Sequence, residues 1–167
     1  MGTGERQAEF LERIDRHRGI LLRVANAYGS SSEDREDLVQ ETIAQLWRSY
    51  PRFDERVAFS TWMYRIAMNV AISSYRNETR KRRTVPAQES VLERVPAPQV
   101  PESDERSDLL RELIGRLEPL ERALMLLYLD DYPHGEIGAI LGISETNVGT
   151  KIGRIKERLK RGVDAAT

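Results

Sequence analysis

The 167-residue sequence contains no cysteine and only two histidines, His17 and His134. Without cysteine, the chain can form no disulfide, no thiolate metal site and no thiol nucleophile. The two histidines are far apart in sequence, and neither a metal-ligand spacing nor a phosphate-binding glycine loop accompanies them. We therefore expect no catalytic residue, no metal site, no cofactor and no enzymatic activity.

Long apolar runs are also missing. The first residues, MGTGERQAEFLER, are charged, and no stretch approaches the ~20 apolar residues that cross a bilayer. We expect a soluble, cytoplasmic protein with no membrane insertion. Apolar residues make up 40% of the chain, which is enough for a core, and their spacing is helical rather than alternating. The sequence predicts an all-α protein.

Proline is concentrated in one segment. Four of the seven prolines lie between residues 84 and 107: Pro86, Pro96, Pro98 and Pro101. Each proline removes a backbone donor and biases the preceding residue away from the helix. We predict a flexible linker over residues 84–107, joining two small helical domains at residues 1–83 and 108–167.

The formal net charge of −1 hides a segregation of charge along the chain. Residues 76–83, RNETRKRR, carry five positive charges and one negative, and residues 145–161 carry six positive and two negative. Residues 33–41 instead hold five acids and one arginine. Each block alone is compatible with a solvated helix face. Two basic blocks at helix ends favour a polyanionic partner, because exposed charges act mainly within a Debye length of ~8 Å.

Residues 136–152, EIGAILGISETNVGTKI, are typical of a helix-turn-helix. Gly142 suits the tight turn, Gly138 lets the two helices approach closely, and Ser144 is a natural N-cap for the second helix. The second helix would then offer these side chains to a DNA groove and its phosphates: Ser144, Glu145, Thr146, Asn147, Thr150, Lys151, Arg154 and Arg158.

A helical hairpin that packs within its own domain is the alternative for this segment. Gly149 and Gly153 each cost ~1 kcal/mol relative to alanine inside a helix. Glu145 would repel phosphate at the start of the second helix. The motif by itself leaves both interpretations open.

Two longer helices are predicted in the first domain. The first has Ser31 and Asp34 as a capping-box pair, an apolar stripe through Leu38, and an end at Pro51. The second has Ser60 as its N-cap, with an apolar stripe formed by Trp62, Met63, Ile66, Ala67, Val70 and Ala71. The other faces of the second helix are predicted to carry Tyr64, Arg65, Met68, Asn69, Ser73, Arg76 and Asn77.

The two domains together resemble bacterial sigma factors of the extracytoplasmic-function (ECF) type, within the sigma-70 superfamily. The resemblance covers nearly the whole chain and is most specific over residues 36–83. It implies that the DLVQE helix docks on the clamp helices of the largest subunit of core RNA polymerase, whose flap is a further contact. The matching residues are Asp37, Leu38, Gln40 and Glu41. The alternative is a solvated acidic helix start, which the macrodipole favours.

The resemblance also implies that the helix beginning FSTW opens the −10 promoter element and holds its non-template strand. Unpaired bases need stacking surfaces and polar groups, and their backbone needs cations. The implied contacts are Phe59, Trp62, Tyr64, Arg65, Asn69, Ser73, Arg76, Asn77, Arg80 and Lys81. Because Trp62 also falls on the apolar stripe, core packing is the favoured alternative for that residue.

Residues 108–167 resemble the family's module that reads the −35 element. The chain departs from the family pattern at two positions. Gly149 stands where a basic residue commonly follows the position of Val148, and Gly138 stands where alanine is usual. These two departures therefore bear on the DNA specificity that the resemblance implies.

The sequence thus predicts a transcription initiation factor that binds core polymerase, directs it to specific promoters and helps to melt the −10 region. The alternative is a sigma-like interaction protein that sequesters an anti-sigma factor without initiating transcription. An ordinary helix-turn-helix repressor would explain only the second domain. The expected partners are core RNA polymerase, promoter DNA and an anti-sigma factor.

Overall fold

The computed structural model describes residues 2–84 and 105–166, and within these ranges every regular element is a helix. The prediction of an all-α fold is confirmed. The chain divides into two compact units, residues 1–95 and 96–167. Most of the predicted linker lies outside the described residues, so its flexibility stays a prediction. None of the described helices is long and apolar enough to span a membrane.

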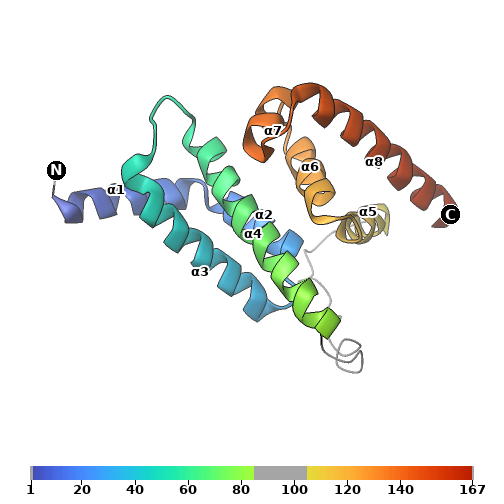
Figure 1. Ribbon diagram of the computed structural model, residues 1–167, viewed down its shortest axis with the longest axis horizontal. Helices are drawn as coiled ribbons and strands as arrows, with labels where there is room; N and C mark the ends of the chain where they lie inside the picture. Colours follow the sequence, from blue (N-terminus) through green and yellow to red (C-terminus); the bar gives the residue numbers. More distant parts are fainter. Residues whose placement is uncertain (1, 85–104, 167) are drawn as a thin grey trace. The chain divides into compact units, whose positions relative to one another are not determined.

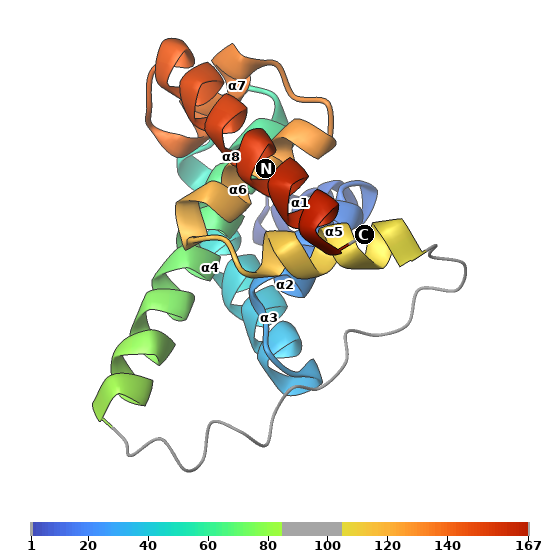
Figure 2. The ribbon, with the colours of Figure 1, turned by 90° about the vertical axis from the view of Figure 1, so that its right-hand side faces the viewer.

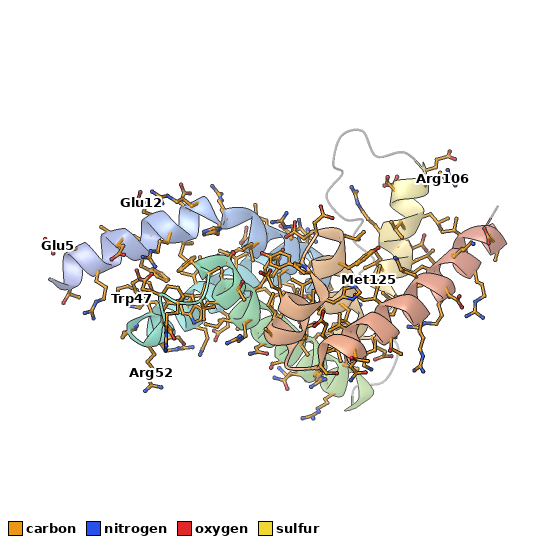
Figure 3. All side chains as sticks on the ribbon, turned by 90° about the horizontal axis from the view of Figure 1, so that it is seen from above. Glu5, Glu12, Trp47, Arg52, Arg106 and Met125 are labelled. Atoms are coloured by element: carbon orange, nitrogen blue, oxygen red, sulfur yellow. The ribbon has the colours of Figure 1, made fainter. Side chains whose placement is uncertain are left out.

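The N-terminal unit contains these elements: α1 (Thr3–Arg16), α2 (Arg18–Tyr28), α3 (Ser32–Ser49), a 3₁₀ turn (Tyr50–Arg52) and α4 (Phe59–Thr84). Helices α2, α3 and α4 pack against one another, while the first turns of α1 extend beyond them (Figure 1). The second half of α1 is held by Phe10, whose ring lies 5.0 Å from Trp47 and 5.1 Å from Tyr50. Trp47 lies beneath α1, and Glu12 points away from the other helices (Figure 3).

The start of α3 is confirmed and the start of α4 is not. Ser31 Oγ accepts a hydrogen bond of 3.1 Å from the Asp34 backbone N–H, as an N-cap does. In contrast, α4 begins at Phe59, and its first turn is closed by the Trp62 N–H donating to the Ala58 carbonyl. Ser60 therefore lies inside the first turn, and its prediction as an N-cap was wrong.

Helix α4 buries a wider arc than its apolar spacing suggested. Its most buried side chains, each at most 1% exposed, are Met63, Tyr64, Ala67, Met68 and Ala71. The arc is wide because α4 packs against both α2 and α3. Tyr64 and Met68 were predicted to lie on other faces, and that prediction was wrong. Ile66 and Val70, predicted for the core, are only half-buried.

The C-terminal unit contains four helices among its described residues: α5 (Glu105–Gly115), α6 (Pro119–Leu129), α7 (His134–Leu141) and α8 (Glu145–Ala166). Helix α8 packs against the other three, with α7 at its N-terminal end (Figure 2). Pro119 occupies the first turn of α6 as predicted. Helix α5 begins three residues before the predicted domain start. The core is formed mainly by Leu124, Leu127, Ile137, Val148 and Ile155.

Candidate nucleic-acid interface

The exposed face of α4 carries most of the side chains predicted to contact the −10 strand. Residues spaced three or four apart share one side of a helix. At this spacing, and opposite the buried arc, lie five exposed side chains: Arg65, Asn69, Ser73, Arg76 and Arg80. Asn77 is exposed on the same side, and Phe59 and Trp62 stand at the head of this row. We call these eight residues the α4 stripe.

Tyr64 does not belong to the α4 stripe. Its side chain is 1% exposed, on the buried side of the helix against α2 and α3. A ring in that position offers no surface for an unpaired base. Tyr64 is therefore a core residue and not an exposed −10 contact, contrary to the prediction.

An open groove of about 970 Å³ runs along the side where α3 and α4 pack together. Its α3 wall includes Asp34, Asp37, Leu38, Gln40 and Glu41, and its α4 wall includes Asn69, Ser73, Asn77 and Lys81. The predicted polymerase contacts and several predicted −10 contacts are thus brought together on two sides of one groove. The carboxylates of α3 repel a polyanion, and Arg65, Arg76 and Arg80 of the α4 stripe do not line the groove with them.

Within the α3 wall, the four predicted polymerase contacts are not equivalent. Asp37, Gln40 and Glu41 are exposed, whereas Leu38 is 7% exposed and packs in the core. Oε1 of Glu41 also lies 3.5 Å from Nη2 of Arg48, two turns further along α3. The accessible face is therefore polar and acidic, and Leu38 supports it from beneath.

A cluster of four aromatic rings forms the head of the α4 stripe. Trp62 lies with its ring centroid 4.8 Å from Phe53 and 5.3 Å from Phe59, and Tyr50 packs 6.3 Å from Trp62. Trp62, Phe53 and Phe59 are each half-buried. Trp62 is thus packed on one side and accessible on the other. This position lies between the two roles considered from the sequence, core packing and contact with an unpaired base.

Arg13 of α1 holds this aromatic cluster from one side, which the sequence did not reveal. Its guanidinium carbon lies 5.9 Å from the ring centroid of Tyr50 and 5.7 Å from those of Phe53 and Phe59. Its Nη2 lies 3.0 Å from a carboxylate oxygen of Glu55, in the loop before α4. The sequence feature that could have indicated this contact is the aromatic-rich stretch YPRFDERVAFSTW, whose clustered rings can pack against a cationic or apolar side chain.

The same Nη2 of Arg13 lies 3.0 Å from Oε1 of Glu9, so Arg13 also forms an ion pair within α1. Burial raises the pKa of the Tyr50 phenol, and the nearby Arg13 charge partly opposes that rise. Arg13 therefore links α1, the 3₁₀ turn and the loop that leads into α4.

The turn between α7 and α8 has the geometry that the sequence predicted. Gly142 has a φ of 75°, in the left-handed region that favours glycine. A methyl group on Gly138 would lie 2.6 Å from the Ile143 carbonyl oxygen, so the close approach requires glycine here. Ser144 Oγ accepts a hydrogen bond of 3.1 Å from the Asn147 backbone N–H, which caps α8. These three predictions are confirmed.

The predicted −35 contacts lie mostly on the exposed side of α8. Seven of them are exposed: Ser144, Glu145, Thr146, Asn147, Thr150, Arg154 and Arg158. Lys151 is half-buried, and Arg158 pairs with Glu121 of α6. Lys156 lies 4.4 Å from the Tyr128 ring centroid. The basic residues of the second half of α8 are thus partly engaged with α6, which leaves the first two turns as the open reading surface.

Two family models match the chain. Residues 13–81 match the family described as Sigma-70 region 2, and residues 107–159 match Sigma-70, region 4. The chain belongs to the sigma-70 family, in its ECF group. The first match includes the α4 stripe, and the second includes the helix-turn-helix.

Individual relatives agree with this assignment. The ECF RNA polymerase sigma factor SigG of Mycobacterium tuberculosis is 35% identical over 82 residues, which span 49% of this chain but only 22% of SigG. The RNA polymerase sigma factor CnrH of Cupriavidus metallidurans is 26% identical over 170 residues, covering 95% of this chain and 88% of CnrH.

Solved structures show the same fold. CnrH in complex with the cytosolic domain of CnrY matches with a TM-score of 0.70 at 23% identity, covering 96% of this chain and 91% of CnrH. The sigma factor RpoE of Bartonella quintana, in complex with the anti-sigma factor NepR, matches with a TM-score of 0.68 at 19% identity. That match covers 95% of this chain and 96% of RpoE.

Proposed function

We propose that this chain is a transcription initiation factor that binds core RNA polymerase, directs it to specific promoters and helps to melt the −10 region. The observation that carries the proposal is the α4 stripe. Exposed arginines and amides run along one face of the helix, and half-buried aromatic rings stand at its head. This combination suits a single strand, because cations track the backbone, amides meet base edges and rings stack on bases.

Polymerase binding is assigned to the exposed part of the α3 wall. Asp37, Gln40 and Glu41 offer an acidic and amide-bearing surface next to the groove. Such a surface complements a basic coiled coil. In this family, the clamp helices of the largest polymerase subunit form a coiled coil of that kind. A second polymerase contact, on the flap, is assigned to the C-terminal unit by family resemblance.

Reading of the −35 element is assigned to the first two turns of α8. Asn147 and Thr150 are exposed there and present amide and hydroxyl groups to a major groove. Lys151 and Arg154 follow as phosphate contacts, and Arg158 joins them only if its pair with Glu121 opens. The helix-turn-helix geometry supports this role over an internal hairpin, because Thr146, Asn147 and Thr150 on the outer side of α8 remain exposed within their own unit.

The factor acts by binding energy alone, in the cytoplasm, while the polymerase performs the chemistry. Its control is assigned to an anti-sigma factor, since RpoE matches this fold in a complex with the anti-sigma factor NepR. The second candidate is a sigma-like protein that only sequesters an anti-sigma factor. Gly149 in the reading helix is the observation that favours this candidate, because it removes a side chain from the DNA-facing end of α8.

The test is reconstitution with sigma-free core polymerase. The full chain should co-elute with core enzyme and support run-off transcription from a dependent promoter. Asp37→Ala combined with Gln40→Ala should weaken co-elution about tenfold, because it removes an interfacial charge and an amide. Asp15→Ala with Asn26→Ala is the matched control, since it removes the same groups from exposed positions on α1 and α2. Failure of the wild-type chain to bind core polymerase would refute the proposal.

A further inference from the structure

Helices α7 and α8 meet at their N-terminal ends through a reciprocal pair of glycines. A methyl group at Gly149 of α8 would lie 3.4 Å from Nδ1 and 3.7 Å from Cε1 of His134, the first residue of α7. A methyl group at Gly135 of α7 would lie 3.7 Å from Oε2 of Glu145, the first residue of α8. Each helix thus places its first side chain over a glycine of the other.

The missing side chain at Gly149 leaves room for the imidazole of His134. A glycine inside a helix costs ~1 kcal/mol relative to alanine. Alanine would make an ordinary contact with the ring at this distance, and a longer side chain that continued in the same direction would meet the imidazole. The His134 side chain of α7 therefore lies beside the place where a side chain at residue 149 of α8 would begin.

His134 borders the open reading surface of α8. The ring is partly exposed, and the residues around Gly149 on the outer side of the helix, Thr146, Asn147 and Thr150, are all exposed. An imidazole offers one donor and one acceptor nitrogen when neutral, so it can hydrogen-bond a base edge or a phosphate. Its position gives it access to the same ligand as these three residues.

Glu145 lies near the start of α7 in the same arrangement, and it remains exposed. Its carboxylate lies over Gly135, at the N-terminal end of α7, where the helix macrodipole stabilises a negative charge.

We propose that His134 is a specificity-determining residue for the −35 element, contacting DNA in place of the side chain that Gly149 lacks. This inference rests on the proposed function. It assigns DNA reading to a residue of the first helix of the helix-turn-helix, outside the α8 residues that the sequence predicted.

The test compares base preference in holoenzymes built on a promoter library randomised across the −35 element, with transcripts counted by sequencing. His134→Ala should reduce the preference at one base position about tenfold, the size of one lost specific contact. Gly149→Gln should change the preference at the same position, because the longer side chain displaces the imidazole. Gly153→Gln is the matched control, since a side chain there meets open space, and it should leave that preference unchanged.

Thermal unfolding of each variant separates loss of contact from loss of fold, and His134→Gln provides a second polar variant if alanine destabilises α7. Base preferences that stay within twofold of wild type in both His134 variants would overturn the inference while leaving the proposed function intact. Wild-type transcription with no base preference in the −35 element would also overturn it. Absence of any promoter-dependent transcript from the wild-type holoenzyme would instead refute the proposed function, and this inference with it.

Discussion

The two units position their predicted DNA contacts by different means. In the C-terminal unit, backbone constraints place the reading helix: Gly142 turns the chain with φ of 75°, and Gly138 lies against a carbonyl oxygen. In the N-terminal unit, side-chain packing places the α4 stripe, through the aromatic cluster and Arg13. The helix-turn-helix is therefore fixed by local geometry, whereas the α4 stripe depends on contacts between distant segments.

The largest expected effect tests the packing of the N-terminal unit. Tyr64→Ala should lower the free energy of unfolding of that unit by about 4 kcal/mol, because a fully buried ring leaves a cavity. Denaturant unfolding followed by circular dichroism measures the change. Asn69→Ala, on the exposed side of the same helix, should change stability by less than about 0.5 kcal/mol and affect only DNA contacts. Equal stability losses would show that the buried arc of α4 is assigned wrongly.

The next effect tests the backbone constraint in the C-terminal unit. Gly138→Val should destabilise that unit by about 3 kcal/mol, because its branched side chain meets the Ile143 carbonyl and the start of α8. Hydrogen exchange of α7 and α8 amides would show the loss, with α2 and α3 unchanged. Gly153→Ala should stabilise the same unit by about 1 kcal/mol, since residue 153 faces open space within a helix. A neutral Gly138→Val would mean that α7 and α8 are not held by this contact.

A smaller effect tests whether Arg13 holds the aromatic cluster. Arg13→Met should cost about 1 kcal/mol of stability through loss of the cation–π contacts, and should speed hydrogen exchange in residues 53–58. Arg16→Met is the control, because Arg16 also pairs with a glutamate four residues earlier but contacts no ring in the structure as described. Similar exchange rates in the two variants would show that Arg13 does not hold the aromatic cluster.

The smallest effect concerns alkaline pH. Burial raises the pKa of Tyr50 above its ordinary value of 10.0, so folding favours the neutral phenol. This stability contribution is complete below pH 10 and is lost as the pH rises through the raised pKa. Tyr50→Phe should therefore flatten the stability curve above pH 10, as measured by thermal unfolding at each pH. An unchanged alkaline curve would contradict the burial of this phenol.

Sequence reasoning succeeded where the determinant is local. The cap at Ser31, the turn at Gly142 and the close approach at Gly138 each depend on a few neighbouring residues, and all three are confirmed. It failed for Tyr64, because the width of the buried arc depends on two other helices packing on α4. Arg13 escaped notice for the same reason, since its partner Glu55 lies 42 residues away in sequence.

The individual DNA and polymerase contacts stay predictions for a related reason. Exposure on the α4 stripe and on α8 makes those side chains available, but which of them bind is set by the partner's shape and charge. The helix-turn-helix shows this limit most clearly: its geometry was predictable, whereas the place of His134 over Gly149 needed the structure.

We expect α4 to melt the −10 element while α8 recruits the polymerase through the −35 element. Permanganate reactivity of −10 thymines tests it most directly, on promoters with an intact or a scrambled −35 element. At saturating holoenzyme, Asn69→Ala should reduce reactivity about tenfold on both promoters, and Asn147→Ala should leave it unchanged. At limiting holoenzyme, Asn147→Ala should reduce reactivity on the intact promoter alone. Full reactivity with Asn69→Ala at saturation, together with a loss for Asn147→Ala there, would contradict the claim.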